Sequence, residues 1–279
     1  MKCKFCKADQ TKEFLHLASP HNKQIYILYE CQNCFSRFFD INQHHISIED
    51  LYEEIATDNS NLSRIFSPTP YWEHQKRIVL ELLKTPLTSI LDVGCRTGDF
   101  LLHFKGDYIK EGIEISNYCS KIAQQRGLNV YNDSLENIKF DKKYDVVSAF
   151  AVIEHLIDPI QFLDKLKSLV NIGGLLIVLI PTFECLKVKV LTKLNIGWHM
   201  YRPPEHLNFF SEKFLDSYLR SNGYRLITRN YTSGGMFNPV RKIPILNSIF
   251  NKVMFYFNKS RLNRLPIFDH SYSYYRKIK

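Results

Sequence analysis

The segment Ser89-Ile-Leu-Asp-Val-Gly-Cys-Arg-Thr-Gly98 contains the strongest indication of the fold class of this chain. Its apolar start predicts a strand, and this strand runs into a turn that contains Gly94 and Gly98. Residues 99–103, Asp-Phe-Leu-Leu-His, then open a helix. Glycine permits a tight turn in which backbone N–H groups approach a ligand closely. We therefore expect an α/β fold with a ligand at this turn.

Strands and helices alternate on both sides of this segment. The periodicity predicts strands over residues 108–114, 128–131, 144–150, 175–180 and 271–275, and helices over 73–84, 117–126, 158–170 and from Ser211. Gly173 and Gly174 are expected to end the helix over 158–170. An alternation of this kind gives a parallel sheet covered by helices on both faces, with its ligand at the carboxyl ends of the strands.

The second of these strands ends in an acid, Glu114, which lies twenty residues after Gly94. A carboxylate at this position can accept hydrogen bonds from both ribose hydroxyls of a nucleoside. The glycine turn and this acid together favour a ligand that contains a nucleoside.

Four of the seven cysteines form two closely spaced pairs, Cys3-Lys-Phe-Cys6 and Cys31-Gln-Asn-Cys34. Two residues between cysteines let a tight turn direct both thiolates at one centre, and two such turns supply the four sulfurs of a tetrahedral zinc site. The alternating segment 24–30 predicts a strand between the pairs. We therefore expect a structural zinc ribbon over residues 1–40, a length of chain that usually needs a metal to fold.

Other fates for the cysteines remain open. The two pairs could be buried free thiols, disulfides or an iron–sulfur site, although a cytosolic setting argues against disulfides. The remaining cysteines, Cys95, Cys119 and Cys185, are scattered, and we expect them in or near the core.

The composition is that of a folded protein without a membrane span. Of the 279 residues, 45% are hydrophobic and 14% aromatic, which excludes wholesale disorder. The longest aliphatic run, Leu175–Ile180, is far shorter than the roughly 20 residues of a membrane-spanning helix. No signal peptide is visible, so we expect a cytoplasmic protein. The polar residues 41–70 predict a linker to a second domain over 71–279.

The positive charge is concentrated near the C-terminus. The net charge is +9, and residues 241–279 hold nine lysines and arginines against a single acid, Asp269. Apolar residues at helical spacing predict a basic amphipathic segment over about 241–266. This segment either packs on the core or lies on the anionic inner face of a membrane. Binding to RNA phosphates is a less favoured alternative.

Four segments together resemble the class I S-adenosylmethionine-dependent methyltransferases. They are Ile90–Gly98, Gly112-Ile-Glu-Ile-Ser116, Glu154-His-Leu-Ile-Asp-Pro159 and Gly173–Pro181. The resemblance covers about residues 71–230 and is strongest to the branch of quinol, sugar and polyketide methylases. It implies a Rossmann-like sheet of seven strands. A zinc ribbon in front of such a domain is familiar from methyltransferases of surface-glycan and deoxysugar pathways.

The resemblance also implies residue roles. Glu114 would bind the ribose hydroxyls, and Phe150 would lie near the reacting sulfonium. The methionine end of the cofactor would be held by Asp92, Gly94, Arg96 and Gly98. The adenine would be held by Asp133 and Ser134. The family usually has glycine where this chain has Arg96. The arginine could pair with the cofactor carboxylate, or it could obstruct the loop.

Two histidines are candidate bases. The methyl group of the cofactor is already activated, so the protein aligns the acceptor and removes a proton from an acceptor oxygen. His155 follows the fourth strand, and a histidine has the right ordinary pKa for this task. Its neighbour Glu154 is either catalytic or part of the scaffold. Related quinol methylases bind a divalent metal with an acid where this chain has Ala151, which argues against such a metal here.

The second candidate is His206, in the aromatic segment 198–210 between the fifth and sixth strands. This region often faces the substrate in the family, although the histidine could instead satisfy loop carbonyls. His199, Tyr201 and Arg202 are weaker candidates in the same segment.

The expected function is methyl transfer from S-adenosylmethionine to an oxygen of a sugar, or of another small or carrier-linked acceptor, in glycan (polysaccharide) biosynthesis. The alternatives are a quinone-type O-methyltransferase, an RNA methyltransferase, and a non-catalytic binding module with a degenerate cofactor loop.

Overall fold

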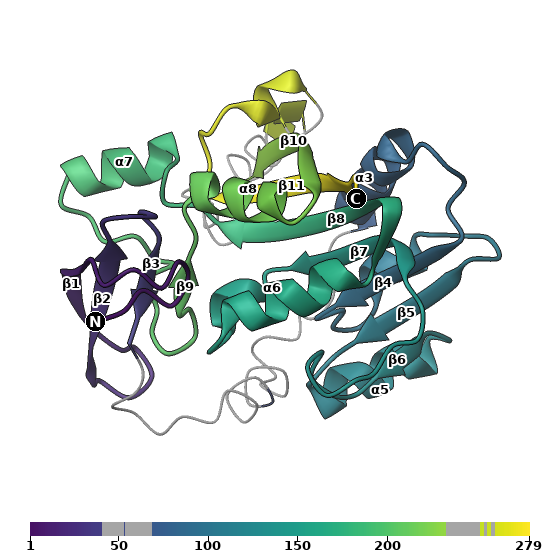
Figure 1. Ribbon diagram of the computed structural model, residues 1–279, viewed down its shortest axis with the longest axis horizontal. Coiled ribbons are helices and arrows are strands. Elements are labelled where there is room, and N and C mark those ends of the chain that lie inside the picture. Colours follow the sequence, from purple (N-terminus) through teal and green to yellow (C-terminus); the bar gives the residue numbers. More distant parts are fainter. Residues whose placement is uncertain (41–52, 54–68, 233–251, 254–255, 258–259) are drawn as a thin grey trace.

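The computed structural model describes residues 1–40, 53, 69–232, 252–253, 256–257 and 260–279 (Figure 1). Most of the expected linker over 41–70, and most of the basic segment over 241–266, lie outside the described residues. Among the described helices, none combines the length and the apolar character that crossing a bilayer requires.

A seven-stranded sheet forms the centre of the molecule, with the order β10-β11-β8-β7-β4-β5-β6. Its strands are β4 (Ser89–Val93), β5 (Ile109–Ile113), β6 (Asn129–Tyr131), β7 (Tyr144–Phe150), β8 (Val170–Pro181), β10 (Tyr224–Thr232) and β11 (His270–Lys277). Strands β4 to β8 pair in parallel, whereas β11 runs antiparallel to both β8 and β10. The expected Rossmann-like sheet of seven strands is therefore confirmed.

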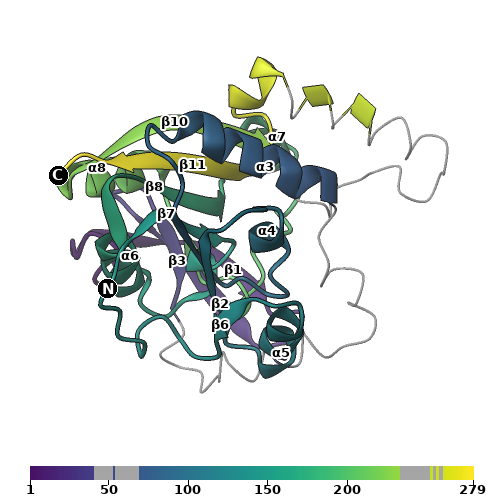
Figure 2. The same cartoon turned by 90° about the vertical axis from the view of Figure 1, so that its right-hand side faces the viewer.

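Helices cover both faces of this sheet, as Figure 2 shows for α4 and α5 on one side and α6 and α8 on the other. The helices are α3 (Thr69–Leu82), α4 (Asp99–Leu102), α5 (Asn117–Gln125), α6 (Pro159–Ser168), α7 (Leu186–Lys193) and α8 (Glu212–Ser221). Strand β8 is apolar on both sides because Leu176 and Val178 face α6, while Leu175 and Ile177 face the α3–α4 side.

The expected role of Gly173 and Gly174 is wrong. Helix α6 ends at Ser168, and both glycines lie inside β8, where the register against β7 shifts. A Cβ on Gly174 would lie 2.7 Å from the backbone oxygen of Asp145. The glycine therefore permits a close approach of β7 rather than ending the helix.

A second, smaller sheet contains the N-terminal residues (Figure 1, left). Strands β1 (Thr11–Ala18), β2 (Ile25–Cys31) and β3 (Arg37–Phe39) are antiparallel, and the fourth strand is β9 (Asn208–Phe209). Strand β9 belongs to the segment between α7 and α8. The N-terminal ribbon therefore completes its sheet with a strand that lies about 170 residues later in the chain.

Candidate functional site

The loop after β4 takes a left-handed backbone conformation at three positions, with φ of 74° at Gly94, 51° at Arg96 and 78° at Gly98. The N–H groups of Gly94 and Cys95 donate to the carbonyl of Ile113 at 2.8 and 3.0 Å, which ties the loop to the end of β5. A Cβ on Gly98 would lie 2.0 Å from Leu128 Cδ1. The left-handed backbone thus favours glycine here, and any side chain would also displace Leu128.

Arg96 occupies the middle left-handed position, where a side chain costs roughly 1–2 kcal/mol. Its side chain is exposed, while its N–H donates to Glu114 Oε2 at 2.8 Å. The arginine therefore strains the backbone of the loop but leaves the turn and its bond to Glu114 intact.

Two buried carboxyl groups lie beneath this loop. Asp92 accepts a hydrogen bond from Ser148 Oγ at 2.7 Å, and burial raises its pKa to about 7. Glu114 accepts from the N–H groups of Arg96 and Ser116, and burial raises its pKa as well. A carboxylate can accept about four hydrogen bonds. Glu114 can therefore hold the loop and still accept from ribose hydroxyls, so the residues fit the cofactor.

The remaining predicted cofactor residues follow β6 and β7. Asp133 is exposed, and its Oδ1 accepts from the N–H of Ser134 at 2.7 Å. Phe150 ends β7 and packs against Trp72 and Phe100, with ring centroids 5.2 and 4.9 Å away. The predicted residues thus lie at the carboxyl ends of four neighbouring strands, β7, β4, β5 and β6. Trp72 was not predicted, because in the sequence it looks like an ordinary aromatic residue of a helix.

The fold brings the two candidate histidines together, with ring centroids 4.9 Å apart. His155 Nδ1 lies 2.6 Å from the carbonyl oxygen of Glu205, and His206 Nδ1 lies 2.8 Å from that of Met200. A carbonyl only accepts, so His206 Nδ1 carries the proton and its Nε2 is the basic nitrogen. Burial lowers the pKa of His155 to about 3 and that of His206 to about 4. Both rings are neutral at neutral pH.

Glu154 lies in the short 3₁₀ turn η2 (Ile153–His155) and is 1% exposed. Its Oε2 has no hydrogen-bond partner among the described residues, and burial raises its pKa to about 8. Its backbone oxygen accepts from the N–H of Leu207 at 2.7 Å. The residue thus joins η2 to the segment that carries His206, and its carboxyl group is neutral at neutral pH.

A buried acid, Asp269, holds the far side of the same segment. Its Oδ2 accepts from Lys187 Nζ at 2.6 Å and Trp198 Nε1 at 2.9 Å, and His199 Nε2 lies 4.0 Å away. Burial would raise the pKa of this carboxyl group, but the bonds from His270, Lys187 and Trp198 hold it below its usual value. Asp269 was not predicted from the sequence, although it is the single acid of a basic segment.

The other weak candidates of this segment also have polar partners. Tyr201 accepts a hydrogen bond from Arg37 Nη1 at 2.6 Å, and Arg202 Nη2 lies 3.1 Å from Glu205 Oε2. Both bonds therefore help to fix the conformation of the segment that carries His206.

The four cysteines of the ribbon lie together, with every sulfur within 4.8 Å of the others. Cys3 and Cys34 are 3.7 Å apart, and Cys6 and Cys31 are 3.6 Å apart. A tetrahedral zinc with bonds of 2.3 Å separates its sulfurs by about 3.8 Å. Lys7 and Phe35, each directly after a pair, are left-handed and donate back to the carbonyls of Cys3 and Cys31. The two turns are alike and fit a tetrathiolate metal site.

Cys95, Cys119 and Cys185 are buried and free, which confirms their expected place in the core. Cys95 lies against Gly112, where a Cβ would approach its sulfur to 2.5 Å.

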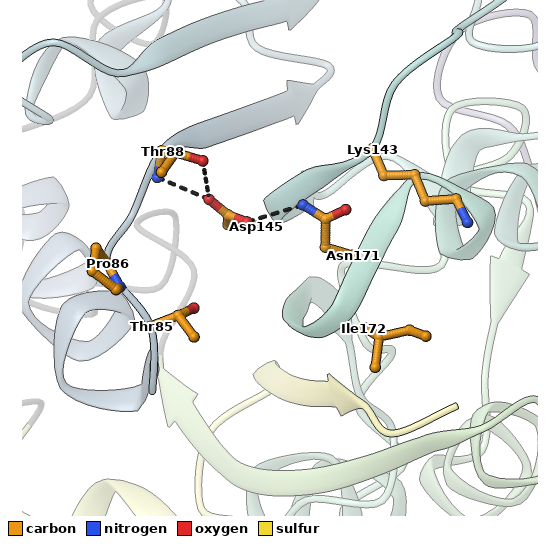
Figure 3. Close-up of a pocket in the computed structure, with 7 residues that line it drawn as sticks. All are labelled: Thr85, Pro86, Thr88, Lys143, Asp145, Asn171 and Ile172. Atoms are coloured by element: carbon orange, nitrogen blue, oxygen red, sulfur yellow. Dashed lines mark hydrogen bonds between the residues drawn. The ribbon is translucent and has the colours of Figure 1, made fainter.

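An open hollow of about 540 Å³ lies at the amino ends of the strands, opposite the cofactor loop (Figure 3). There Asp145 Oδ2 accepts from the N–H and Oγ1 of Thr88, and its Oδ1 accepts from Asn171 Nδ2 at 2.9 Å. These bonds tie the amino ends of β4, β7 and β8 together. The predicted cofactor residues lie at the carboxyl ends of the strands instead.

Comparisons with known proteins agree with this geometry. A family model described as a methyltransferase domain matches residues 48–229. The mitochondrial ubiquinone biosynthesis O-methyltransferase of Dictyostelium discoideum is 28% identical over 176 residues, which cover 54% of this chain and 53% of that protein.

Solved methyltransferases share the fold. A possible histamine N-methyltransferase from Thermotoga maritima superposes with a TM-score of 0.54 at 18% identity, covering 84% of this chain and all of that one. Magnesium protoporphyrin IX methyltransferase from Synechocystis, with bound S-adenosylmethionine, gives 0.53 at 13% identity, covering 84% and 99%. With its glycine loop and buried Glu114, the chain belongs to the methyltransferase-domain family and is an S-adenosylmethionine-dependent methyltransferase.

Proposed function

We propose that the protein methylates an oxygen of a sugar, or of another small or carrier-linked acceptor, in glycan biosynthesis. The observation that carries this proposal is the position of His206. Its segment is hydrogen-bonded to the turn after β7, at the same ends of the strands as the cofactor loop. S-adenosylmethionine, when bound, supplies a methyl group that is already activated by its positive sulfur. The residues of this chain then have to orient the acceptor and take its proton.

His206 suits the role of base better than His155. The ring of His155 lies against the backbone of both Ala151 and Glu205, so its nitrogens face main-chain groups. His206 is anchored through Nδ1, and its Nε2 lies 3.9 Å from Glu205 Oε1. Because its pKa is lowered to about 4, the ring is in the basic form at neutral pH. His206 would accept the proton that the acceptor hydroxyl loses.

Calorimetric titration with S-adenosylmethionine and S-adenosylhomocysteine tests the cofactor half. We expect micromolar binding in the wild type. Glu114→Ala should weaken it at least about tenfold, because the change removes a buried acceptor for the ribose and for the loop. The exposed Glu136→Ala is the matched control and should bind normally. Equal affinity in both variants would remove Glu114 from the site.

A panel of acceptors then tests the substrate. Nucleotide sugars and lipid-linked saccharides should be methylated if the proposal is right. A quinone-type catechol is the second candidate, favoured by the 28% identity to a ubiquinone biosynthesis O-methyltransferase. Turnover of catechols in the absence of any turnover of sugars would replace the first proposal by the second.

We also propose that the ribbon binds one structural zinc ion through Cys3, Cys6, Cys31 and Cys34. The support is the spacing of the sulfurs, which is close to that of a tetrahedral tetrathiolate centre. Four thiolates leave no open position, so the role is structural. Elemental analysis should find one zinc per chain, and Cys6→Ser with Cys31→Ser should abolish it. Metal-free wild-type protein that keeps its fold would contradict the assignment.

An anionic membrane surface is the proposed partner that would present a carrier-linked acceptor. Helix α7 supports this, because Leu186, Val190 and Leu194 recur at helical spacing and are 55%, 46% and 62% exposed. The exposed Lys189 and Lys193 flank them, and residues 186–197 contain no acid. An apolar stripe with basic flanks fits an anionic interface. The Leu186 end of α7 is bonded to the chain at Pro266, beside the exposed Arg264.

A further inference from the structure

The ribbon and the acceptor side of the site share one hydrogen-bonded ladder. Strand β3 pairs with β9, placing Arg37 opposite Phe209 and Phe38 opposite Asn208. The N–H of Phe39 donates to the carbonyl of Leu207 at 2.9 Å. These bonds begin at the residue directly after His206, so the backbone that carries this histidine is held by the ribbon.

Side chains of the ribbon extend the same contact. Ser36 Oγ accepts from the N–H of Ser211 at 3.0 Å. Arg37 donates to Tyr201 at 2.6 Å while it also pairs with Glu30 inside the ribbon. His21 Nε2 lies 3.6 Å from Glu205 Oε2. The ribbon thus contacts the segment on both sides of His206.

The opposite side of this segment is bonded to the turn that carries His155. The N–H of Leu207 donates to the Glu154 carbonyl at 2.7 Å, and the carbonyl oxygen of Glu205 lies 2.6 Å from His155 Nδ1. Asn208 Nδ2 donates to the carbonyls of Ile153 and Leu156 at 3.1 and 2.6 Å. Residues 205–211 are therefore clamped between the ribbon and the end of β7, and both histidines depend on their position.

The cofactor loop is held differently. Residues 94–96 are bonded to Ile113 and Glu114 at the end of β5, two strands away from β7 in the sheet order. Loss of order in the ribbon should therefore reach the histidines before it reaches the cofactor site.

A metal is what makes the ribbon a stable clamp. Segments of about 40 residues rarely fold without a metal or disulfides, and the binding free energy of a structural zinc is largely folding free energy. The last cysteine, Cys34, lies two residues before Ser36 and three before Arg37, which make the contacts with the acceptor side. A metal that fixes the four cysteines therefore also fixes the start of β3, which begins three residues after Cys34.

We propose that the metal-loaded ribbon is the positioning element of the acceptor side: metal binding orders β3, β3 holds β9, and β9 sets the positions of His206 and His155. The inference rests on the proposed function and its zinc site. It assigns the ribbon a role in aligning the acceptor machinery and no role in holding the cofactor.

Hydrogen exchange of the full-length protein tests the proposal, with zinc loaded, removed by a chelator and restored. Removal should speed exchange of the amides in 205–211 at least about tenfold. Strands β4 and β8 should keep their protection, and calorimetric affinity for S-adenosylhomocysteine should stay within twofold. The imidazole proton signals of His206, followed by NMR, should shift and return with zinc.

Two outcomes would overturn the proposal. If the ribbon loses protection while 205–211 stays protected, the ribbon does not position the segment. If cofactor affinity falls together with the protection of 205–211, the metal supports the whole fold. Failure of the wild type to bind S-adenosylhomocysteine at all would instead count against the proposed function.

A pair of variants tests the contact without removing the metal. Arg37→Ala breaks the bond to Tyr201, whereas Lys12→Ala breaks only the ribbon's own surface pair with Glu30. Both should retain one zinc, and only Arg37→Ala should speed exchange in 205–211 and shift the His206 signals. Equal behaviour of the two variants would contradict the clamp.

Discussion

At the residue scale, burial assigns the protonation states of the site. His155 and His206 are neutral because their desolvated rings resist a positive charge, and Glu154 is neutral because its desolvated carboxyl resists a negative one. A neutral imidazole is what a base requires. The sequence could identify these residues but could not assign their charges, since burial depends on chain segments remote from each of them.

The base can be identified by mutation. We expect His206→Ala to lower turnover of the accepted substrate by about 10²-fold or more, the usual contribution of general base catalysis, with cofactor affinity unchanged. His155→Ala should act mainly on stability, because its ring nitrogens face main-chain groups. Rates in the presence of saturating cofactor measure this. Turnover within twofold of wild type in His206→Ala would exclude it as the base.

At the scale of elements, the sequence predicted the strand–loop–helix units well and their ends less well. The strand predicted over 144–150 has the observed bounds, whereas the strand over 271–275 and the helices over 73–84 and 117–126 are present with ends shifted by one to four residues. Local periodicity and capping determine such units, as with Asp158, whose side chain caps the start of α6. Gly173 and Gly174 were misassigned because a glycine needed for close packing looks the same as one that ends a helix.

The corrected role of these glycines can be measured. Gly174→Ala should lower the free energy of unfolding by about 1–3 kcal/mol, because its Cβ would meet the rigid backbone oxygen of Asp145. Gly197→Ala is the control, since nothing lies within 4 Å of a Cβ there. Urea titrations compare the two. A Gly174→Ala protein as stable as the control would show that β7 and β8 separate at little cost.

At the scale of the whole molecule, stability depends on pH through the buried acids. Glu154 keeps its proton in the folded protein up to about pH 8, whereas an ordinary glutamate releases it near 4.5. The folded state therefore binds more protons between these values, and this group's contribution to the free energy of unfolding falls as pH rises, by up to about 1.4 kcal/mol per unit.

Replacing the acid isolates this contribution. Glu154→Gln cannot titrate, so its stability relative to wild type should increase by about 1 kcal/mol or more between pH 5 and pH 8. Denaturant titrations at four pH values measure the difference. The exposed Glu136→Gln should keep a constant offset from wild type. A constant offset for Glu154→Gln as well would mean that Glu154 is ionised in the folded protein.

Vesicle binding tests the surface of α7. The wild type should sediment with vesicles that contain anionic phosphatidylglycerol and remain in solution with neutral phosphatidylcholine. Leu194→Glu should reduce sedimentation several-fold. Ile172→Glu is the matched control, because Ile172 is 73% exposed and lies beside the hollow at the amino ends of the strands (Figure 3). Equal loss in both variants, or a concentration-dependent dimer through α7, would contradict the membrane contact.

The sequence was sufficient for the features that depend on neighbouring residues: the glycine loop with Glu114 at the next strand end, the order of strands and helices, and the two cysteine turns. Periodicity, turn chemistry and ligand spacing are local properties, so a single sequence contains them. The pairing of β3 with β9, the contact between His155 and His206, and the burial of Asp269 depend on the tertiary fold. They join residues up to 172 positions apart, as in the pairing of Arg37 with Phe209. Such contacts form only when the whole chain packs, because their partners are selected by shape and burial and not by spacing.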